Sequence, residues 1–230
     1  MELSYLPNTD SKELYQIFIQ RDWEHLNQIL ENSGYERLGF DRLFIILSDL
    51  QQRFGNTKMK ILDVGCNNGL FSFGLAALGH RVTGIDNGII DTQKRYDKLQ
   101  FMDVVNTHLE LNFFDAKIED YLDTTEEKWD CILLLSILHQ LEGGYAFDET
   151  SKYTPEKVTE LVNKLFSRGS KVIYYECPYD EPGFELLAGL HFLDRHLINR
   201  ERFSIEEIAK TVGPNGVIRQ LYAIMPINHY

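Results

Sequence analysis

Two glycines and two carboxylic acids in the first half of the sequence have spacing that suits a site for a nucleoside. The segment 61–69 reads ILDVGCNNG, in which Asp63 interrupts an apolar run and Gly65 and Gly69 frame a short loop. Glycine has no Cβ, so such a loop can pass close to a ligand. Asp86 lies 21 residues after Gly65, and a carboxylate there can accept hydrogen bonds from both ribose hydroxyls. These residues indicate an adenosine-bearing ligand.

The same loop does not suit a pyrophosphate. The second and third glycines of the dinucleotide fingerprint would fall at Asn67 and Leu70, and no Lys-Ser or Lys-Thr pair follows the loop as a phosphate-binding P-loop requires. Asp63 places a negative charge where a pyrophosphate would be repelled. That charge suits a cationic ligand end such as an ammonium or a sulfonium.

One histidine is the best candidate for a general base. His139 follows the apolar run 130–135 by four residues. The ordinary pKa of histidine, about 6.5, suits proton transfer near neutral pH. The alternative is a histidine that binds substrate or packs under a loop, because no neighbour in the sequence clearly orients its ring.

Alternating apolar runs and helical patterns predict the elements that position these residues. Strands are predicted at 60–64, 81–85, 109–113, 130–135, 170–176 and 217–225, and helices at 69–78, 88–99, 117–122 and 155–166. Such alternation is typical of a mostly parallel, doubly wound α/β sheet. Ligands of these sheets lie at the carboxyl ends of the strands, where we expect the glycine loop, Asp86 and His139.

Further helices are predicted before and after this core. Apolar spacing favours helices at 11–31 and 40–54, so we expect residues 1–56 to form an N-terminal helical cap within the same domain as 57–230. A helix is predicted at 182–198, and Ser204 with Glu207 has the capping-box pattern of another. The loop 142–154 is the best candidate for a lid.

The segment 61–69 resembles the first motif of class I S-adenosylmethionine (SAM)-dependent methyltransferases, with Asn67 in place of the middle glycine. The resemblance extends over residues 58–176. It implies a seven-stranded, Rossmann-like sheet, SAM as the cofactor and S-adenosylhomocysteine as the product. The positions that match cofactor-binding segments of the family are Asp63, Gly65, Cys66, Asn67, Gly69, Asp86, Asn87, Asp115, Ala116 and Ser136.

Several of these positions have simpler interpretations. Asp63 could bond the loop amides, Asp86 with Asn87 could be a turn, and Asp115 could cap the helix that follows. Two arginines of the cap, Arg37 and Arg42, could reach the methionine carboxylate of SAM, although solvated arginines are the alternative.

Composition narrows the function classes. The net charge of −12 disfavours a broad basic face for nucleic acid. Cys66, Cys131 and Cys177 form no C-x-x-C pair and are expected to be reduced and buried. No signal peptide or membrane-spanning run is evident, so we expect a cytoplasmic protein. The acids and histidines near 176–196 lack the spacing of metal ligands, and no metal is predicted.

Three functions remain from these observations. The first is transfer of a methyl group from SAM to an oxygen or nitrogen of a small molecule or saccharide by in-line displacement. The second is 2′-O-methylation of RNA, which requires a basic patch. The third is a non-catalytic SAM-binding sensor or scaffold subunit. A dehydrogenase is a minor alternative, because the loop lacks the glycines that admit a pyrophosphate.

Overall fold

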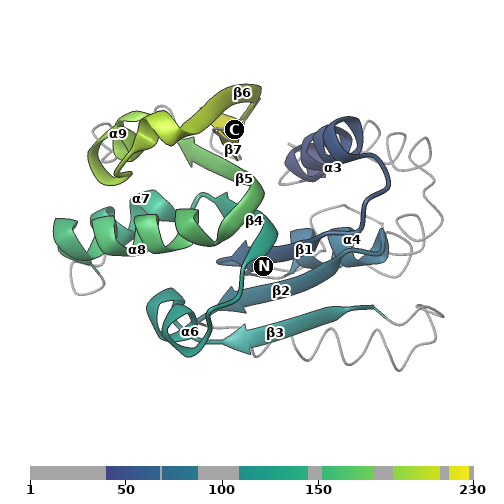
Figure 1. Cartoon of the computed structure of the whole chain (residues 1–230), viewed down its shortest axis with the longest axis horizontal. Helices are drawn as coiled ribbons and strands as arrows, with labels where there is room; N and C mark the ends of the chain where they lie inside the picture. Colours follow the sequence, from purple (N-terminus) through teal and green to yellow (C-terminus); the bar gives the residue numbers. More distant parts are fainter. Residues whose placement is uncertain are drawn as a thin grey trace. The chain divides into compact units, whose positions relative to one another are not determined.

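The computed structural model describes residues 40–67, 69–87, 109–144, 152–178, 189–212 and 218–227. The helices predicted at 11–31 and 88–99 lie outside these residues, as does Arg37. Contacts divide the chain into two compact units, residues 1–118 and 119–230. The helices and strands of both units are labelled in Figure 1.

Seven strands have the order β3-β2-β1-β4-β5-β7-β6 in one sheet. The elements are α3 (Phe40–Phe54), β1 (Lys60–Val64), α4 (Leu70–Ala77), β2 (Arg81–Asp86), β3 (Leu111–Asp115), α6 (Ile118–Thr124), β4 (Trp129–Leu135), α7 (Leu138–Gly143), α8 (Pro155–Arg168), β5 (Gly169–Pro178), α9 (His191–His196), a 3-10 turn (Arg200–Arg202), β6 (Phe203–Val212) and β7 (Ile218–Pro226). The predicted mostly parallel α/β sheet is confirmed.

The first unit contains three parallel strands with α4 packed on β2 and β3. In β1, every residue after Lys60 is buried, which explains the apolar run in the sequence. Phe73 of α4 and Phe113 of β3 pack with ring centroids 5.5 Å apart. The parallel register pairs Asp86 with Asp115, so the acids that end β2 and β3 lie at the same edge.

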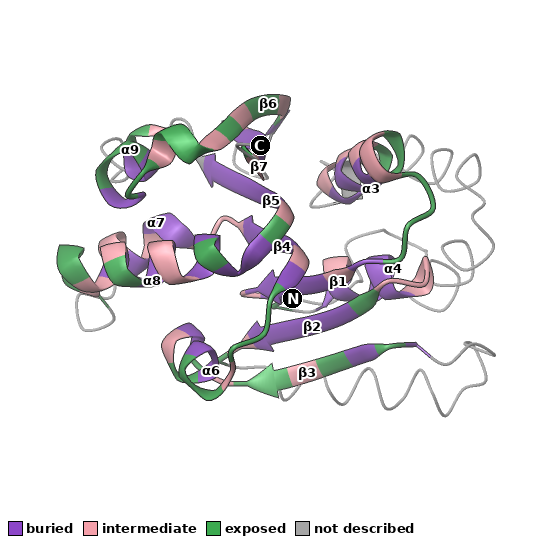
Figure 2. Cartoon of the chain, viewed as in Figure 1, coloured by how far each residue is buried: buried purple, intermediate pink, exposed green. Residues whose placement is uncertain are grey.

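The second unit combines parallel and antiparallel pairing. β4 and β5 are parallel, whereas β7 pairs antiparallel with both β5 and β6. Figure 2 shows that β4 and β5 are mostly buried. The rings of Tyr175 and Tyr222 stack across β5 and β7 at 6.2 Å. Because β7 runs against β5, β7 begins at the edge of the sheet where β5 ends.

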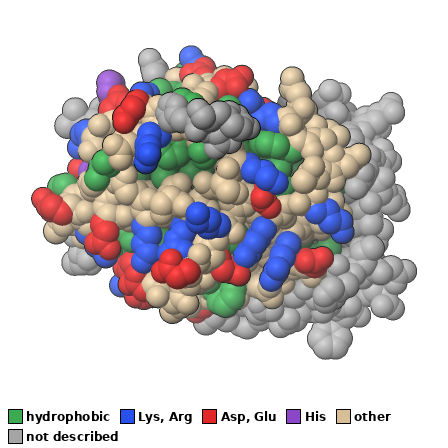
Figure 3. Space-filling view, in the orientation of Figure 1, with side chains coloured by type: hydrophobic (Ala, Val, Ile, Leu, Met, Phe, Trp, Pro, Cys, Tyr) green, Lys and Arg blue, Asp and Glu red, His purple; other side chains and the backbone are tan. Residues whose placement is uncertain are grey.

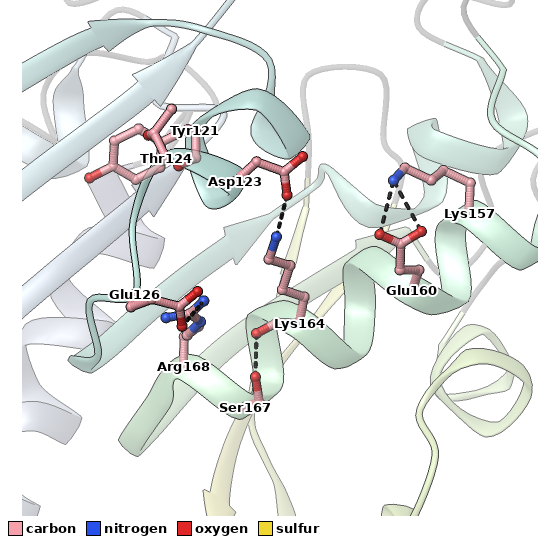
Figure 4. A network of polar contacts seen from close by, with 9 residues as sticks. All are labelled: Tyr121, Asp123, Thr124, Glu126, Lys157, Glu160, Lys164, Ser167 and Arg168. Carbon is pink, nitrogen blue, oxygen red and sulfur yellow. Dashed lines mark hydrogen bonds and ion pairs between the residues drawn. The ribbon is translucent and has the colours of Figure 1, made fainter.

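Helix α8 of this unit has buried apolar residues and charged residues that form ion pairs. Thr154 accepts a hydrogen bond from the Lys157 amide as an N-cap, and Pro155 starts the helix. Apolar residues such as Leu161 and Leu165 are buried. Figure 4 shows that Lys164 pairs with Asp123 of α6, and that Arg168 and Lys157 pair with other acids. The apolar side and these ion pairs hold α8 in place.

One predicted element is wrong. The capping-box pattern at Ser204 and Glu207 predicted a helix, but the segment forms β6, which pairs with β7 from Phe203 to Val212. The register shifts between Glu207 and Ala209. This bulge breaks the period of two and produces the spacing of a helix in the sequence. β6 is the seventh strand that the family resemblance implied.

Candidate functional site

The loop after β1 has a backbone that turns through three left-handed residues. Gly65, Asn67 and Gly69 have φ angles of 68°, 47° and 79°. The amides of Gly65 and Cys66 donate to the carbonyl of Ile85 at 2.8 and 3.1 Å. Glycine adopts positive φ without strain, and asparagine does so more readily than most residues. Asn67 can therefore adopt the left-handed conformation that this position of the loop has.

Asp86 is bound to the glycine loop. Its Oδ2 accepts a hydrogen bond from the Asn67 amide at 2.9 Å, and its carbonyl accepts one from the Ala116 amide at 3.1 Å. Burial raises the pKa of the Asp86 carboxyl, while the amides of Asn67 and Asn87 oppose the rise and Asp115 adds to it. Asp86, at the end of β2, is thus hydrogen-bonded both to the glycine loop and to the residue after β3.

Asp63 is buried at the base of the same loop, with 3% of its surface exposed. Its Oδ2 accepts a 2.5 Å hydrogen bond from the Ser72 hydroxyl of α4, a partner that the sequence did not suggest. Burial raises the pKa of Asp63 to about 6, with Asp86 contributing through charge repulsion. A cationic ligand beside this carboxylate would relieve that cost.

The other predicted residues of this unit take varied positions. Cys66 is buried and its thiol pKa is raised by burial and by the two nearby aspartates. A Cβ on Gly84 would lie 3.0 Å from the sulfur of Cys66 and 2.7 Å from the ring of Phe113, so β2 needs glycine at this position.

Arg42 of α3 lies over the ring of Phe71, with its guanidinium carbon 5.6 Å from the ring centroid, and Asp115 is exposed. The three cysteines are free and buried, as predicted.

In the second unit, Ser136 follows β4 in a left-handed conformation with φ of 56°. Its amide donates to the Glu176 carbonyl of β5 at 3.2 Å, and its hydroxyl accepts a hydrogen bond from the Arg219 guanidinium of β7. Arg219 also lies 3.6 Å from the carboxylate of Glu176, which is fully buried. Sequence reasoning singled out Ser136 and considered Glu176 among the acids near 176–196, but it missed Arg219.

His139 lies in the first turn of α7 with 2% of its surface exposed. Burial, and after it the positive charge of Arg219, lower its pKa to about 4. The ring is therefore neutral at physiological pH. A neutral imidazole can accept a proton or a hydrogen bond, although a pKa of about 4 makes it a weak base.

No group of three or more potential metal ligands gathers among the described residues. In the same part of the chain, no helix is long and apolar enough to cross a membrane.

Residues 62–156 match the family model described as a methyltransferase domain. A ubiquinone biosynthesis O-methyltransferase of Rickettsia felis is 27% identical over 146 residues, which are 62% of this chain and 55% of that protein. One from Vibrio atlanticus is 25% identical over 133 residues, 58% of this chain and 48% of the relative. The chain spans about half the length of these curated relatives.

Solved structures share the fold. The magnesium protoporphyrin IX methyltransferase of Synechocystis PCC 6803 with bound SAH has a TM-score of 0.58 and 15% identity, covering 94% of this chain and all of that chain. The bifunctional kinase-methyltransferase WbdD has a TM-score of 0.61 and 21% identity, covering 84% of this chain and 43% of that chain. Together with the motifs of the glycine loop, these matches support a class I SAM-dependent methyltransferase.

Proposed function

We propose that the protein transfers a methyl group from SAM to an oxygen atom of a small molecule. The observation that carries the proposal is the bond between the glycine loop and Asp86, with the Asn67 amide 2.9 Å from its carboxylate. This bond fixes a carboxylate beside the loop, as recognition of a ribose requires. Asp63 supplies a second negative charge at the base of the loop, suited to a cationic methionine tail.

Other described residues would complete the cofactor site. Gly65, Cys66 and Gly69 would bring the backbone against SAM. Asn87 follows β2, and Asp115 and Ala116 lie at the end of β3, where they would face the adenosine in this proposal. Arg42 is a candidate for the methionine carboxylate. SAM supplies the electrophilic methyl group, and the acceptor oxygen displaces the sulfur in line. The protein therefore acts chiefly by positioning the acceptor at about 3 Å from the methyl.

The residues after β4 are the proposed acceptor side. Ser136 presents a hydroxyl held by Arg219, and His139 presents a neutral imidazole. Such a ring can accept the proton of a hydroxyl acceptor as the methyl is transferred, so that the acceptor loses H⁺ and gains CH₃ while SAM becomes S-adenosylhomocysteine. Oxygen is favoured over nitrogen because the curated relatives are named as O-methyltransferases.

Charge does not favour the RNA alternative. The chain has a net charge of −12, and basic and acidic side chains are interspersed among the described residues on the face in Figure 3. RNA binding through phosphates requires a concentration of basic side chains. We therefore prefer a small-molecule acceptor over RNA.

Two measurements test the proposal. Calorimetry with SAM and S-adenosylhomocysteine should show binding to the wild-type protein. Absence of binding of either compound would refute the cofactor assignment. Incubation with methyl-labelled SAM and a cell extract separated into small-molecule, RNA and protein fractions should then label the small-molecule fraction. Label in RNA would support the alternative acceptor, and SAM binding without label in any fraction would favour a non-catalytic sensor.

A further inference from the structure

The carboxyl edge of the second unit carries a polar group formed by three strands. β4 ends at Leu135, which pairs with Glu176 of β5. Pro178, two residues later, pairs with Arg219 near the start of antiparallel β7. The reversal of β7 therefore brings Arg219 to the edge where β4 and β5 end. This placement follows from sheet topology and joins residues that are 83 positions apart, Ser136 and Arg219.

We propose that Arg219 is a positioning residue of the acceptor side, holding the Ser136–His139 segment in one conformation through the Ser136 hydroxyl and the buried Glu176 carboxylate. The expected effect on methyl transfer rests on the proposed function. The contacts that define it lie entirely within the second unit.

The backbone of Ser136 gives the first reason. Its φ of 56° is one that L-residues with a Cβ seldom adopt, and such residues persist where surrounding contacts hold them. Two contacts hold Ser136, one through its backbone and one through its side chain. Its amide donates to the Glu176 carbonyl at 3.2 Å, and its hydroxyl accepts from the Arg219 guanidinium. Removing the guanidinium removes the side-chain contact alone.

Charge gives the second reason. The Glu176 side chain is 0% exposed and lies 3.6 Å from Arg219, so loss of the guanidinium would leave a buried carboxylate without this cation. The same guanidinium acts on His139, where its charge disfavours the imidazolium. Arg219 therefore affects both ends of the Ser136–His139 segment, one by hydrogen bonding and the other by charge.

Arg219→Gln, Arg219→Lys and Ser136→Ala test the proposal, with Arg200→Gln as the matched control. Arg200 pairs with the exposed Asp194 in the same unit. The readouts are the NMR titration of the His139 ring and the rate of label transfer from SAM to the small-molecule fraction of an extract. Thermal unfolding identifies variants that fold, and Arg219→Lys keeps the cation if Arg219→Gln does not fold.

We expect Arg219→Gln to raise the titration midpoint of His139, because the positive charge that disfavours the imidazolium is removed, and to lower the transfer rate by at least about tenfold. Arg219→Lys should keep the low midpoint and recover part of the rate. Ser136→Ala should lower the rate while leaving the midpoint near the wild-type value. Arg200→Gln should change neither.

An unchanged His139 titration in folded Arg219→Gln, or an unchanged rate in both Arg219→Gln and Ser136→Ala, would overturn the proposal. Calorimetry with SAM keeps this failure separate from failure of the proposed function. Wild-type protein that binds no SAM refutes the function, whereas variants that bind SAM like the wild type but transfer methyl groups at the wild-type rate refute the role of Arg219.

Discussion

The backbone amide of Asn67 lies 2.9 Å from the Oδ2 atom of Asp86 and donates a hydrogen bond to it. The residue that departs from the family's glycine pattern thus orients the carboxylate proposed to bind ribose. The contact is made by the backbone, so the side chain of residue 67 is not needed for it. This explains how the loop tolerates asparagine in place of glycine.

Asp86→Ala should weaken binding of SAM and of S-adenosylhomocysteine. Charge-assisted hydrogen bonds to the ribose are expected to contribute about 2–3 kcal/mol, which corresponds to roughly a 30- to 150-fold loss of affinity. Isothermal titration calorimetry measures the change. Asp120→Ala removes an exposed acid from α6 and should leave the affinity unchanged. Equal affinity in Asp86→Ala and the wild type would contradict the role of this carboxylate.

Asp63 should make the folded protein less stable as the pH rises from about 4 to about 6. Burial raises its pKa from the ordinary value of 3.8 to about 6, so the folded state binds more protons than the unfolded state within this window. The free energy of unfolding then falls by about 3 kcal/mol from this group alone as the pH increases. Urea unfolding at several pH values measures the slope.

The variant Asp63→Asn isolates this contribution. An amide keeps an acceptor for the Ser72 hydroxyl and does not titrate, so the difference between wild type and variant should change across pH 4–6 and be flat above it. A difference that is constant with pH would show that Asp63 is ionised throughout.

With SAM bound, the cation should lower the Asp63 pKa, so SAM affinity should increase as the pH rises through 6.

The elements were predictable where burial gave a clear pattern. β1 and β4 are buried along nearly their whole length, and their apolar runs located them to within one residue. β6 was not predictable in the same way, because the bulge between Glu207 and Ala209 interrupts the alternation that identifies a strand. Local sequence cannot show the antiparallel partner that makes such a segment a strand.

In the candidate site, too, sequence could identify residues close together in the chain but not residues brought together by the fold. Asp63, Gly65 and Asp86 could be proposed from the sequence because the loop and the following strand are close together in the chain. Ser72 and Arg219 were missed because their roles depend on tertiary contacts, a hydroxyl directed from α4 to Asp63 and a guanidinium brought from β7 to β4. A serine or an arginine at these positions carries no motif of its own.

His139 should contribute a pH dependence of the opposite sign. Its pKa falls from 6.5 to about 4, so the unfolded state binds more protons between these values and the stability rises with pH across the window. The contribution is about 3 kcal/mol and is fully present above pH 6.5. Asp63 contributes a slope of opposite sign in nearly the same window, so the test is the difference in unfolding free energy between wild type and His139→Asn, which should change between pH 4 and 6.5. A difference that is constant with pH would place the titrating group elsewhere.

Glu142 should stabilise the arrangement of α7 with α8 and α9. Its carboxylate accepts hydrogen bonds from Arg195 at 3.2 and 2.6 Å and lies 3.0 Å from Nε2 of His196. The other ring nitrogen of His196 lies 2.8 Å from the Thr159 hydroxyl of α8. The His196 side chain is 4% exposed, so its ring depends on these partners rather than on water.

Glu142→Gln should therefore lower the free energy of unfolding by about 2 kcal/mol, because a charged acceptor is lost beside a buried ring. Asp194→Asn is the matched control, since it breaks the pair between Asp194 of α9 and Arg200 of the 3-10 turn, whose side chains are 49% and 40% exposed. That change should cost less than about 1 kcal/mol. Chemical denaturation at pH 7 compares the two, and equal costs would show that the Glu142 cluster is an ordinary surface ion pair. A larger cost for Glu142→Gln would establish that α7, the helix that carries His139, is held by the side chains of α8 and α9.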